Sequence, residues 1–333
     1  MESKNFKILV VGVMVIVLSC ITLWSGKTDG QERKYPNKPI EVIVTYPPGG
    51  PVDIGTRILV NDLQKELGVP ITIQYKPGAG GMIGASYVAT SKPDGYTLVS
   101  NTYSSLISAP FLEKETAPYD PLKDFTPIVA YGVGANVLAN HSSSNITSFD
   151  ALVKFVKEKP GELTCSTPGA GTTAHFILEV LKMYGVNIIP VPTKGGGPSA
   201  TSVLGKHTDL GVFLYSAGVP HIKSGALRPL AATNKIGQEP GVPTFREKGF
   251  PECEVLGAWL SLLGPANLPK PIQDQIASAT RKVIQMPSVI KSLEDAGYTV
   301  GYKGPEELSK AFPEEYKTME KIFKSAGVGK FAK

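Results

Sequence analysis

The sequence contains little cysteine, histidine or tryptophan: three, four and two of these residues among 333. Only Cys165 and Cys253 lie beyond the first 30 residues, which excludes a disulfide framework as what holds the protein together. Cys165 lies in a predicted strand, so we interpret it as a packed free thiol. The four histidines show no spacing that is typical of a metal site. We therefore expect no metal ion.

The sequence also lacks a strong charge of either sign. Charged residues make up 19% of the chain, and the formal net charge is +5. The first 30 residues contain three lysines and two acidic residues, which leaves about +4 for the rest. No basic run has the length that nucleic-acid binding requires. We therefore expect no nucleic-acid partner, and the mild positive charge is compatible with a small anionic ligand.

An apolar run lies at the N-terminus. Lys4 and Lys7 precede residues 8–24, which are almost entirely apolar, and polar sequence begins at Ser25. This pattern predicts a secretory signal within residues 1–30 and a periplasmic location, with an uncleaved membrane anchor as the alternative. Residues 17–20 loosely resemble a bacterial lipobox, which would make Cys20 a lipidated N-terminus; we rank lipidation below plain cleavage.

Glycine and proline are abundant, with 35 and 28 residues, which is too many for a helical bundle. One apolar run at residues 40–44 breaks into PPGGPVD at residues 47–53, and apolar residues then recur with helical spacing over 54–67. This pattern predicts a strand, a rigid glycine loop and a helix. The unpaired N–H groups at such a helix start favour an anion.

The same arrangement recurs at three further glycine loops, at residues 76–81, 167–173 and 192–199. Tight turns in any α/β fold need glycine, which is the ordinary explanation for each loop alone. Repetition with the same polarity in both halves of the chain favours a functional role. The four loops therefore predict one shared anion site.

Strands alternate with helices along most of the chain, which predicts an α/β protein with parallel sheets and right-handed crossovers. Two long apolar segments, residues 128–139 and 255–263, interrupt the alternation and are interpreted as crossings between two lobes. We expect lobe I over residues 35–134 and 260–333, and lobe II over 135–259. Helices are predicted over residues 271–286, 288–296 and 305–326, the last packing back on lobe I.

No enzyme class finds support in the motifs. Residues 169–174 match the G-x-G-x-x-A dinucleotide pattern, but no acidic residue for the ribose stands near position 191. The chain has neither a Walker loop nor a G-x-S-x-G elbow. We expect no cofactor and no catalytic residues.

Five polar residues near the glycine loops have both a functional and an ordinary interpretation. Asp53 is either a helix N-cap or a ligand-positioning carboxylate. His175 is either a ligand contact or a histidine with local hydrogen bonds. Asp209 opens a strand and lies either at the floor of a cleft or in a turn. Lys76 and Lys194 either pair with a ligand carboxylate or are exposed lysines, and the second explanation is favoured.

Several motifs, in order along the chain, resemble one known family. They are YPPGG at residues 46–50 with Asp53, KPGAGG at 76–81, PDGYTL at 93–98, KGGGP at 194–198, PHIKSG at 220–225, VPT at 242–244 and GPA at 264–266. The chain resembles the periplasmic substrate-binding receptors of tripartite tricarboxylate transporters, the Bug family, over essentially its whole length after the signal.

The resemblance implies a type II periplasmic-binding-protein fold, in which two α/β lobes joined by two crossover segments close on a ligand. It implies a monomeric, non-catalytic receptor for a small carboxylate: a di- or tricarboxylate, an acidic amino acid or an aromatic acid. It also implies two partners, the large and small membrane subunits of the transporter. A sensory receptor for a membrane kinase and, less favoured, a secreted α/β enzyme remain alternatives.

The resemblance also implies ligand contacts, which backbone amides, hydroxyls and ordered waters provide. Carried over by position, the predicted contacts are Pro48, Gly49, Gly50, Asp53, Gly78, Ala79, Gly80, Gly81, Thr102, Ser104, Ser166, Gly169, Gly171, Thr172, Thr173, His175, Gly195, Gly196, Gly197, Ser199, Asp209 and Tyr215. The sequence departs from the family pattern at residues 51–52, where small hydroxyl residues are frequent, and at residues 214–215, where a polar residue often stands. These departures leave the identity of the carboxylate open.

Overall fold

A computed structural model describes residues 34–112, 117–170, 172–327 and 329–331. The chain divides into two units, Met1–Asn37 and Lys38–Lys333, and the description below concerns the second. The predicted signal over residues 1–30, with Cys20, lies outside the described residues. Within the described ranges, no helix combines the length and the apolar character needed to cross a bilayer.

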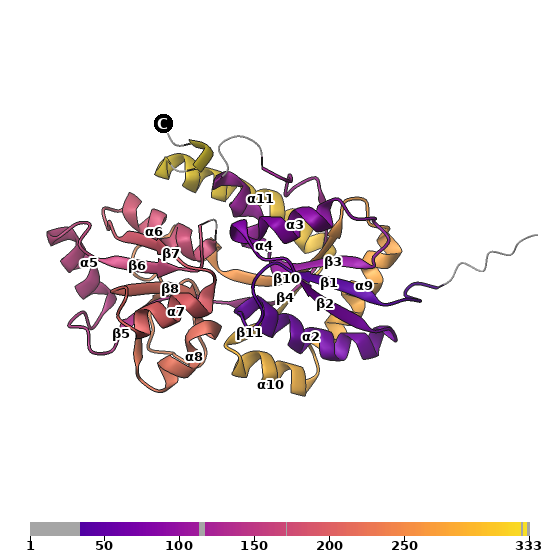
Figure 1. The fold of residues 1–333 in the computed structure, drawn as a ribbon, viewed down its shortest axis with the longest axis horizontal. Coiled ribbons are helices and arrows are strands. Elements are labelled where there is room, and N and C mark those ends of the chain that lie inside the picture. The colour runs from indigo at the N-terminus through magenta and orange to yellow at the C-terminus, as the bar shows by residue number, and fades with distance from the viewer. Residues whose placement is uncertain (1–33, 113–116, 171, 328, 332–333) are drawn as a thin grey trace, which may run out of the picture. The chain divides into compact units, whose positions relative to one another are not determined.

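The first sheet has six strands in the order β11-β4-β10-β3-β1-β2 (Figure 1). Strands β1, β2 and β3 are parallel, as predicted. Strand β10 runs antiparallel to β3 and β4, and β11 antiparallel to β4, so the expectation of an all-parallel sheet is wrong for these strands. The bounds are β1 Ile40–Val44, β2 Ile71–Tyr75, β3 Thr97–Thr102, β4 Phe125–Gly134, β10 Ala258–Pro265 and β11 Tyr298–Lys303.

The second sheet has five strands in the order β7-β6-β8-β5-β9. Strand β6 is parallel to β7 and β8, whereas β5 is antiparallel to β8 and β9. This sheet is therefore mixed as well. The bounds are β5 Asn136–His141, β6 Thr164–Thr167, β7 Ile189–Pro192, β8 Leu210–Leu214 and β9 Leu227–Ala232.

Helices cover both sheets. In Figure 1, α3, α4 and α11 lie above the first sheet and α2 and α10 below it, while α6 lies above the second sheet and α7 and α8 below it. The α-helices are α2 Pro51–Leu67, α3 Met82–Ala89, α4 Tyr103–Ser108, α5 Phe149–Glu158, α6 Thr173–Met183, α7 Gly196–Leu204, α8 Tyr215–Lys223, α9 Lys270–Val283, α10 Pro287–Asp295 and α11 Pro305–Ala326. Short 3₁₀ helices are η1 Ala79–Gly81, η2 Ala109–Leu112, η3 Pro251–Leu256 and η4 Gly329–Phe331.

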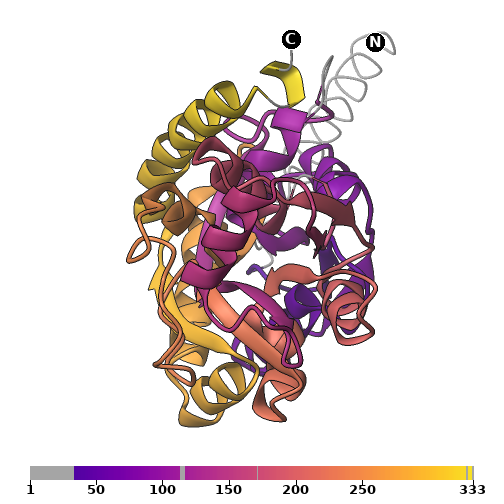
Figure 2. The ribbon, with the colours of Figure 1, turned by 90° about the vertical axis from the view of Figure 1, so that its left-hand side faces the viewer.

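The chain crosses between the sheets twice. It leaves the first sheet at the end of β4 and enters the second at β5, and it returns between η3 and β10. These crossings fall in the two long apolar segments that the sequence singled out, although the first of them forms two separate strands. We call the first sheet with α2–α4 and α9–α11 lobe I, and the second sheet with α5–α8 lobe II. Figure 2 views the molecule from the side of lobe II.

Apolar burial explains why the central strands form. The four apolar residues of β1 have no exposed surface, as expected for a parallel strand with helices on both faces. The last helix, α11, buries Leu308, Phe312, Met319 and Phe323. Cys165 and Cys253 are buried and free.

Candidate functional site

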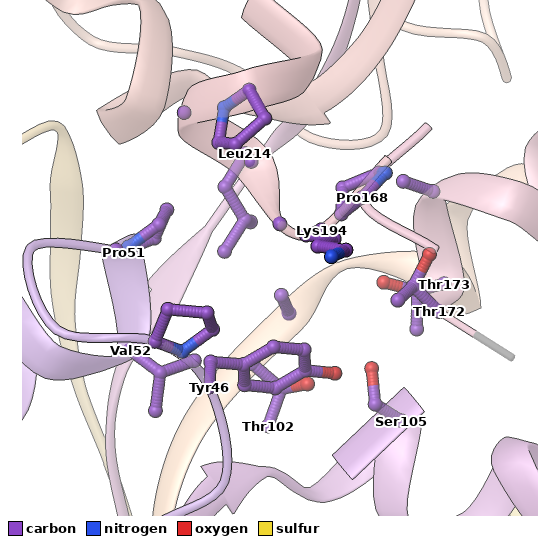
Figure 3. Close-up of a pocket in the computed structure, with 18 of the residues that line it drawn as sticks. Tyr46, Pro51, Val52, Thr102, Ser105, Pro168, Thr172, Thr173, Lys194 and Leu214 are labelled. Carbon is purple, nitrogen blue, oxygen red and sulfur yellow. The ribbon is translucent and has the colours of Figure 1, made fainter. Parts of the chain in front are cut away.

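A cavity of about 350 Å³ lies between the two lobes (Figure 3). The loop after β1 and the start of α4 form its wall on the side of lobe I, and the starts of α6, α7 and α8 form the wall on the side of lobe II. Its lining residues are Tyr46, Pro47, Pro48, Gly49, Gly50, Pro51, Val52, Thr102, Ser105, Asn136, Pro168, Thr172, Thr173, Ala174, Lys194, Gly195, Gly196, Gly197, Pro198, Leu214 and Ala258.

Five helices begin at this cavity, because strands β1 and β3 of the first sheet and the parallel strands β6, β7 and β8 of the second present their carboxyl ends to it. This edge is where open α/β sheets bind ligands. The residues that precede the five helices, Gly50, Thr102, Thr172, Gly195 and Leu214, all line the cavity. No side chain caps α2, α7 or α8. Unpaired N–H groups and positive helix ends therefore point toward one space, which favours an anion.

The first glycine loop uses two of its own amides internally. The N–H of Gly49 donates to Oδ2 of Asp53 at 2.7 Å, and the N–H of Gly50 donates to the carbonyl of Pro47 at 3.2 Å. Asp53 is buried and does not line the cavity. Its other oxygen accepts from Nε of Arg57 at 2.9 Å and from the hydroxyl of Tyr75 at 2.8 Å. Asp53 therefore fixes the loop, and Gly50, not Asp53, is the N-cap of α2.

The second glycine loop is not part of the cavity wall. Gly78, Ala79, Gly80 and Gly81 lie behind Tyr46, whose hydroxyl donates to the carbonyl of Gly80 at 3.2 Å. A Cβ on Gly81 would lie 3.2 Å from both the Asn101 amide nitrogen and the Thr45 hydroxyl. The structure thus brings three of the four predicted loops together, and the second loop supports the wall through Tyr46.

Hydroxyl groups gather at one end of the cavity. Figure 3 shows the oxygens of Tyr46, Ser105, Thr172 and Thr173 on the same side. Burial raises the pKa of Tyr46, so its phenol stays neutral near pH 7 and keeps the hydrogen that it donates to Gly80. Asn136 braces this end: its Nδ2 donates to Oγ1 of Thr173 at 2.9 Å and to the carbonyl of Leu256 at 2.8 Å.

Nine of the predicted contacts lie in the cavity wall: Pro48, Gly49, Gly50, Thr102, Thr172, Thr173, Gly195, Gly196 and Gly197. Gly171 lies outside the described residues. The others take part in the supporting structure. The hydroxyl of Ser104 donates to the carbonyl of Gly257 at 2.8 Å, and Oγ of Ser166 donates to the carbonyl of Ser199 at 2.9 Å. The carbonyl of Gly169 accepts from the Thr172 hydroxyl at 2.8 Å.

Three further predicted residues also lie away from the wall. Asp209 precedes β8, at the opposite end of that strand from Leu214, and accepts from the backbone N–H and hydroxyl of Thr164, both at 2.8 Å. The hydroxyl of Tyr215 donates to Glu239 at 3.0 Å. His175 is half-buried, its Nδ1 is buried without a hydrogen-bond partner, and burial lowers its pKa.

Besides Lys194, eleven lining residues are absent from the predicted contacts: Tyr46, Pro47, Pro51, Val52, Ser105, Asn136, Pro168, Ala174, Pro198, Leu214 and Ala258. Tyr46 and Pro47 adjoin the first loop, and Ser105 follows the hydroxyl-rich end of β3. Their closeness in sequence to predicted contacts could have identified all three. Asn136 and Ala258 stand just inside the second and first sheets, at the two crossings, where no motif marks them. Lys194, favoured as an ordinary lysine, is exposed but does lie in the wall.

The described part of the chain contains no cluster of three histidine, cysteine or acidic residues that could hold a metal ion. Tyr46 and Lys194 are the titratable side chains among the described lining residues. Taken together, the described lining residues offer hydrogen-bond donors and one positive charge. They are suited to holding an anion in place.

Comparison with known proteins agrees with this geometry. Residues 56–328 match the model of the tripartite tricarboxylate transporter family receptor. Protein BugT of Bordetella pertussis is 30% identical over 296 residues, which cover 88% of this chain and 90% of BugT.

Two solved structures that hold carboxylates are also similar. An R. palustris protein with adipate has a TM-score of 0.81 and 28% identity, over 89% of this chain and 99% of its own. MatC from Rhodopseudomonas palustris with bound malate has a TM-score of 0.79 and 27% identity, over 86% and 99%. The fold is thus that of the two-lobed periplasmic binding proteins. The chain therefore belongs to the receptor family of the tripartite tricarboxylate transporters, the Bug family.

Proposed function

We propose that this protein is an exported receptor that captures a small carboxylate between its two lobes and delivers it to the large and small membrane subunits of a tripartite tricarboxylate transporter. The observation that carries the proposal is the convergence of uncapped helix starts on one cavity between the lobes. Similar proteins hold adipate and malate, which supports a carboxylate as the ligand.

Capture by lobe closure agrees with the contacts between the lobes. At the cavity, a Cβ on Gly196 of lobe II would lie 3.4 Å from Cγ of Pro51 in lobe I, so these loops already approach closely. A ligand that touches both loops stabilises the closed arrangement by its differential affinity for it. We place the hinge at the two crossings, near residues 134–136 and 256–258.

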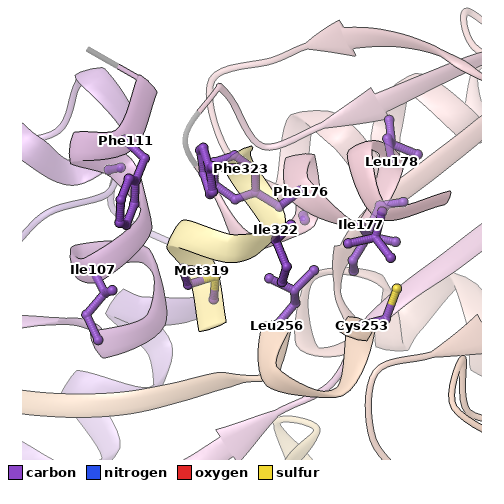
Figure 4. Close-up of a cluster of buried hydrophobic side chains, with 14 of the residues drawn as sticks. Ile107, Phe111, Phe176, Ile177, Leu178, Cys253, Leu256, Met319, Ile322 and Phe323 are labelled. Carbon is purple, nitrogen blue, oxygen red and sulfur yellow. The ribbon is translucent and has the colours of Figure 1, made fainter. Parts of the chain in front are cut away.

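An apolar cluster limits how the lobes can move. Figure 4 shows Phe323 of α11 between Phe111 of lobe I and Phe176 of lobe II. Its ring centroid lies 4.9 Å from that of Phe111 and 4.1 Å from that of Phe176. Closure is therefore expected to be a rotation that keeps this contact packed.

Catalysis is not part of the proposal. The described lining residues include no cysteine, histidine or carboxylate. A receptor needs only complementary donors and a closing cleft, both of which are present.

Thermal unfolding tests the proposal. The purified protein is unfolded and refolded to remove bound ligand, and its midpoint is measured with mono-, di- and tricarboxylates and with aromatic acids. A ligand at a hundred times its dissociation constant adds about 2.7 kcal/mol to the free energy of unfolding. We expect one acid or a narrow group to raise the midpoint. No shift with any acid, in a sample shown to be folded and ligand-free, would refute carboxylate capture.

A further inference from the structure

Polar and apolar groups occupy different ends of the cavity. In Figure 3 the hydroxyls of Ser105, Thr172 and Thr173 lie together, and the side chains of Pro51, Val52 and Leu214 lie away from them. Val52 is 3% exposed and Leu214 is half-buried, so both present packed apolar surface to the cavity. A ligand that fills the cavity therefore has one polar end and one apolar end.

Charged side chains are distributed as unevenly over the cavity wall as polar ones. Lys194 is the one charged side chain among the described residues that line the cavity. One anionic group of a ligand can pair with Lys194 while it accepts hydrogen bonds at the hydroxyl end of the cavity. A second carboxylate at the other end would lose its water and find no side-chain donor on Pro51, Val52 or Leu214.

The starts of α2 and α8 do not offset this deficit at the apolar end, and the uncapped start of α7 directly follows Lys194, so it serves the same anionic group as that lysine. Helix α2 begins with Pro51, which has no N–H, and its first turn already holds the carboxylate of Asp53. A second anion would meet this charge at the same helix end. Of α8, only the N-cap residue Leu214 lines the cavity. By contrast, α6 carries no acidic residue in its first turn, and the hydroxyl of Thr173, which accepts from Asn136, keeps its own hydrogen for a ligand.

We infer that the ligand is a monocarboxylate with an apolar body, such as an aromatic or branched aliphatic acid, and not a di- or tricarboxylate. Its carboxylate lies at the Thr172–Thr173 end, and its body packs against Pro51, Val52 and Leu214. The cavity of about 350 Å³ has the room, since a cavity of about 150 Å³ holds benzene. This inference rests on the proposed function and specifies its substrate class.

Matched pairs of acids test the inference on the purified, refolded protein. Benzoate is compared with terephthalate, and hexanoate with adipate, because each pair differs by a second carboxylate at the far end. Calorimetric titration is expected to show each monocarboxylate binding at least about tenfold more tightly than its partner. Equal or tighter binding of the dicarboxylates would overturn the inference and leave the proposed function intact. If neither these four acids nor any other carboxylate binds, both fail together.

Substitution at the apolar end gives an independent test. Leu214→Lys places an ammonium group where the second carboxylate would lie, so it should reverse the preference within each pair and weaken benzoate by about tenfold. Leu204→Lys is the matched control, since Leu204 is also half-buried in lobe II but does not line the cavity. It should leave the preference unchanged. An unchanged preference in a folded Leu214→Lys protein would contradict the inference, and Leu214→Gln, which should only reduce the preference, serves if the lysine variant does not fold.

Discussion

The carboxylate of Asp53 holds the backbone of Gly49, accepting its N–H at 2.7 Å from within the first turn of α2. Gly49 has a positive φ of 75°, a conformation that favours glycine. Two residues therefore determine the conformation of the loop that follows β1: Gly49 permits the turn, and Asp53 holds it by a hydrogen bond. The contact links the sequence motif to the cavity wall, because Gly49 lines the cavity and Asp53 does not.

Replacing Asp53 with alanine should destabilise the protein. It leaves the N–H of Gly49 and the hydroxyl of Tyr75 without their acceptor, and hydrogen bonds to a charged group contribute about 1.5–3 kcal/mol. We expect the free energy of unfolding in urea to fall by about 2–3 kcal/mol. The control is Asp295→Ala, which removes the exposed pair with Lys291 and should cost less than about 1 kcal/mol. Equal losses in the two variants would show that Asp53 does not fix the loop.

The second glycine loop should prove structural. Gly81 has a φ of 97°, and an added Cβ would press on Asn101 and Thr45. Gly68 has a φ of 72° and nothing within 4 Å of an added Cβ. Gly68→Ala should therefore cost only the left-handed strain, about 1–2 kcal/mol, and Gly81→Ala should cost about 1 kcal/mol or more in addition. Chemical unfolding of the two variants measures the difference, and a Gly81→Ala protein as stable as Gly68→Ala would contradict the close approach.

Burial of Glu179 should make stability depend on pH. Its Oε2 has no hydrogen-bond partner, and burial raises its pKa above the ordinary 4.5. The folded protein thus binds this proton more tightly than the unfolded chain. The contribution is fully present below pH 4.5 and is lost as the pH rises through the folded pKa.

Glu179→Gln should therefore raise the free energy of unfolding at pH 8 relative to the native protein, by about 1 kcal/mol, and should give no such gain at pH 4.5. Urea unfolding at the two pH values measures this. A gain of the same size at both pH values would rule out ionisation of Glu179 as the cause.

The sequence was informative where chemistry is local. The apolar run of β1 and the glycine loop before α2 specify a strand, a turn and a helix by themselves. Strand β11 escaped notice although its residues, YTVGYK, alternate between apolar and polar, because the C-terminal part of the chain was interpreted as helical throughout. The antiparallel direction of β10 is set by its pairing with β3, which ends at Thr102, and with β4, which ends at Gly134. The residues of β10 alone do not specify these partners.

The same distinction between local patterns and long-range contacts applies to the residues of the site. Thr172 and Gly195 were predicted because each follows a strand and precedes a helix. Asp209 was predicted from its place beside a strand, yet it stands before β8, and the cavity lies at the other end of that strand. Asn136 was missed because its role comes from three segments that meet only in the folded protein: β5, the start of α6 and the end of η3.

Asn136 supplies the sharpest test of the site. It is 1% exposed, stands at the first crossing and donates to Leu256 at the second, so it ties the two crossings to the hydroxyl end of the cavity. Asn136→Asp replaces the donating amide with a carboxylate that repels both the Leu256 carbonyl and an anionic ligand. We expect carboxylate affinity to fall by at least about a hundredfold, because an unpaired buried charge and a lost donor act together.

The matched control lies on the same strand. Asn140 is also buried, and its Nδ2 donates to the carbonyl of Ile146 at 2.7 Å, but it does not line the cavity. Asn140→Asp should lower stability to a similar extent without lowering the affinity of the folded protein. Binding is measured by calorimetric titration at a temperature where urea curves show both variants folded. Similar affinities for the two variants would mean that Asn136 acts only on stability. The placement of the ligand carboxylate at the hydroxyl end would then be wrong.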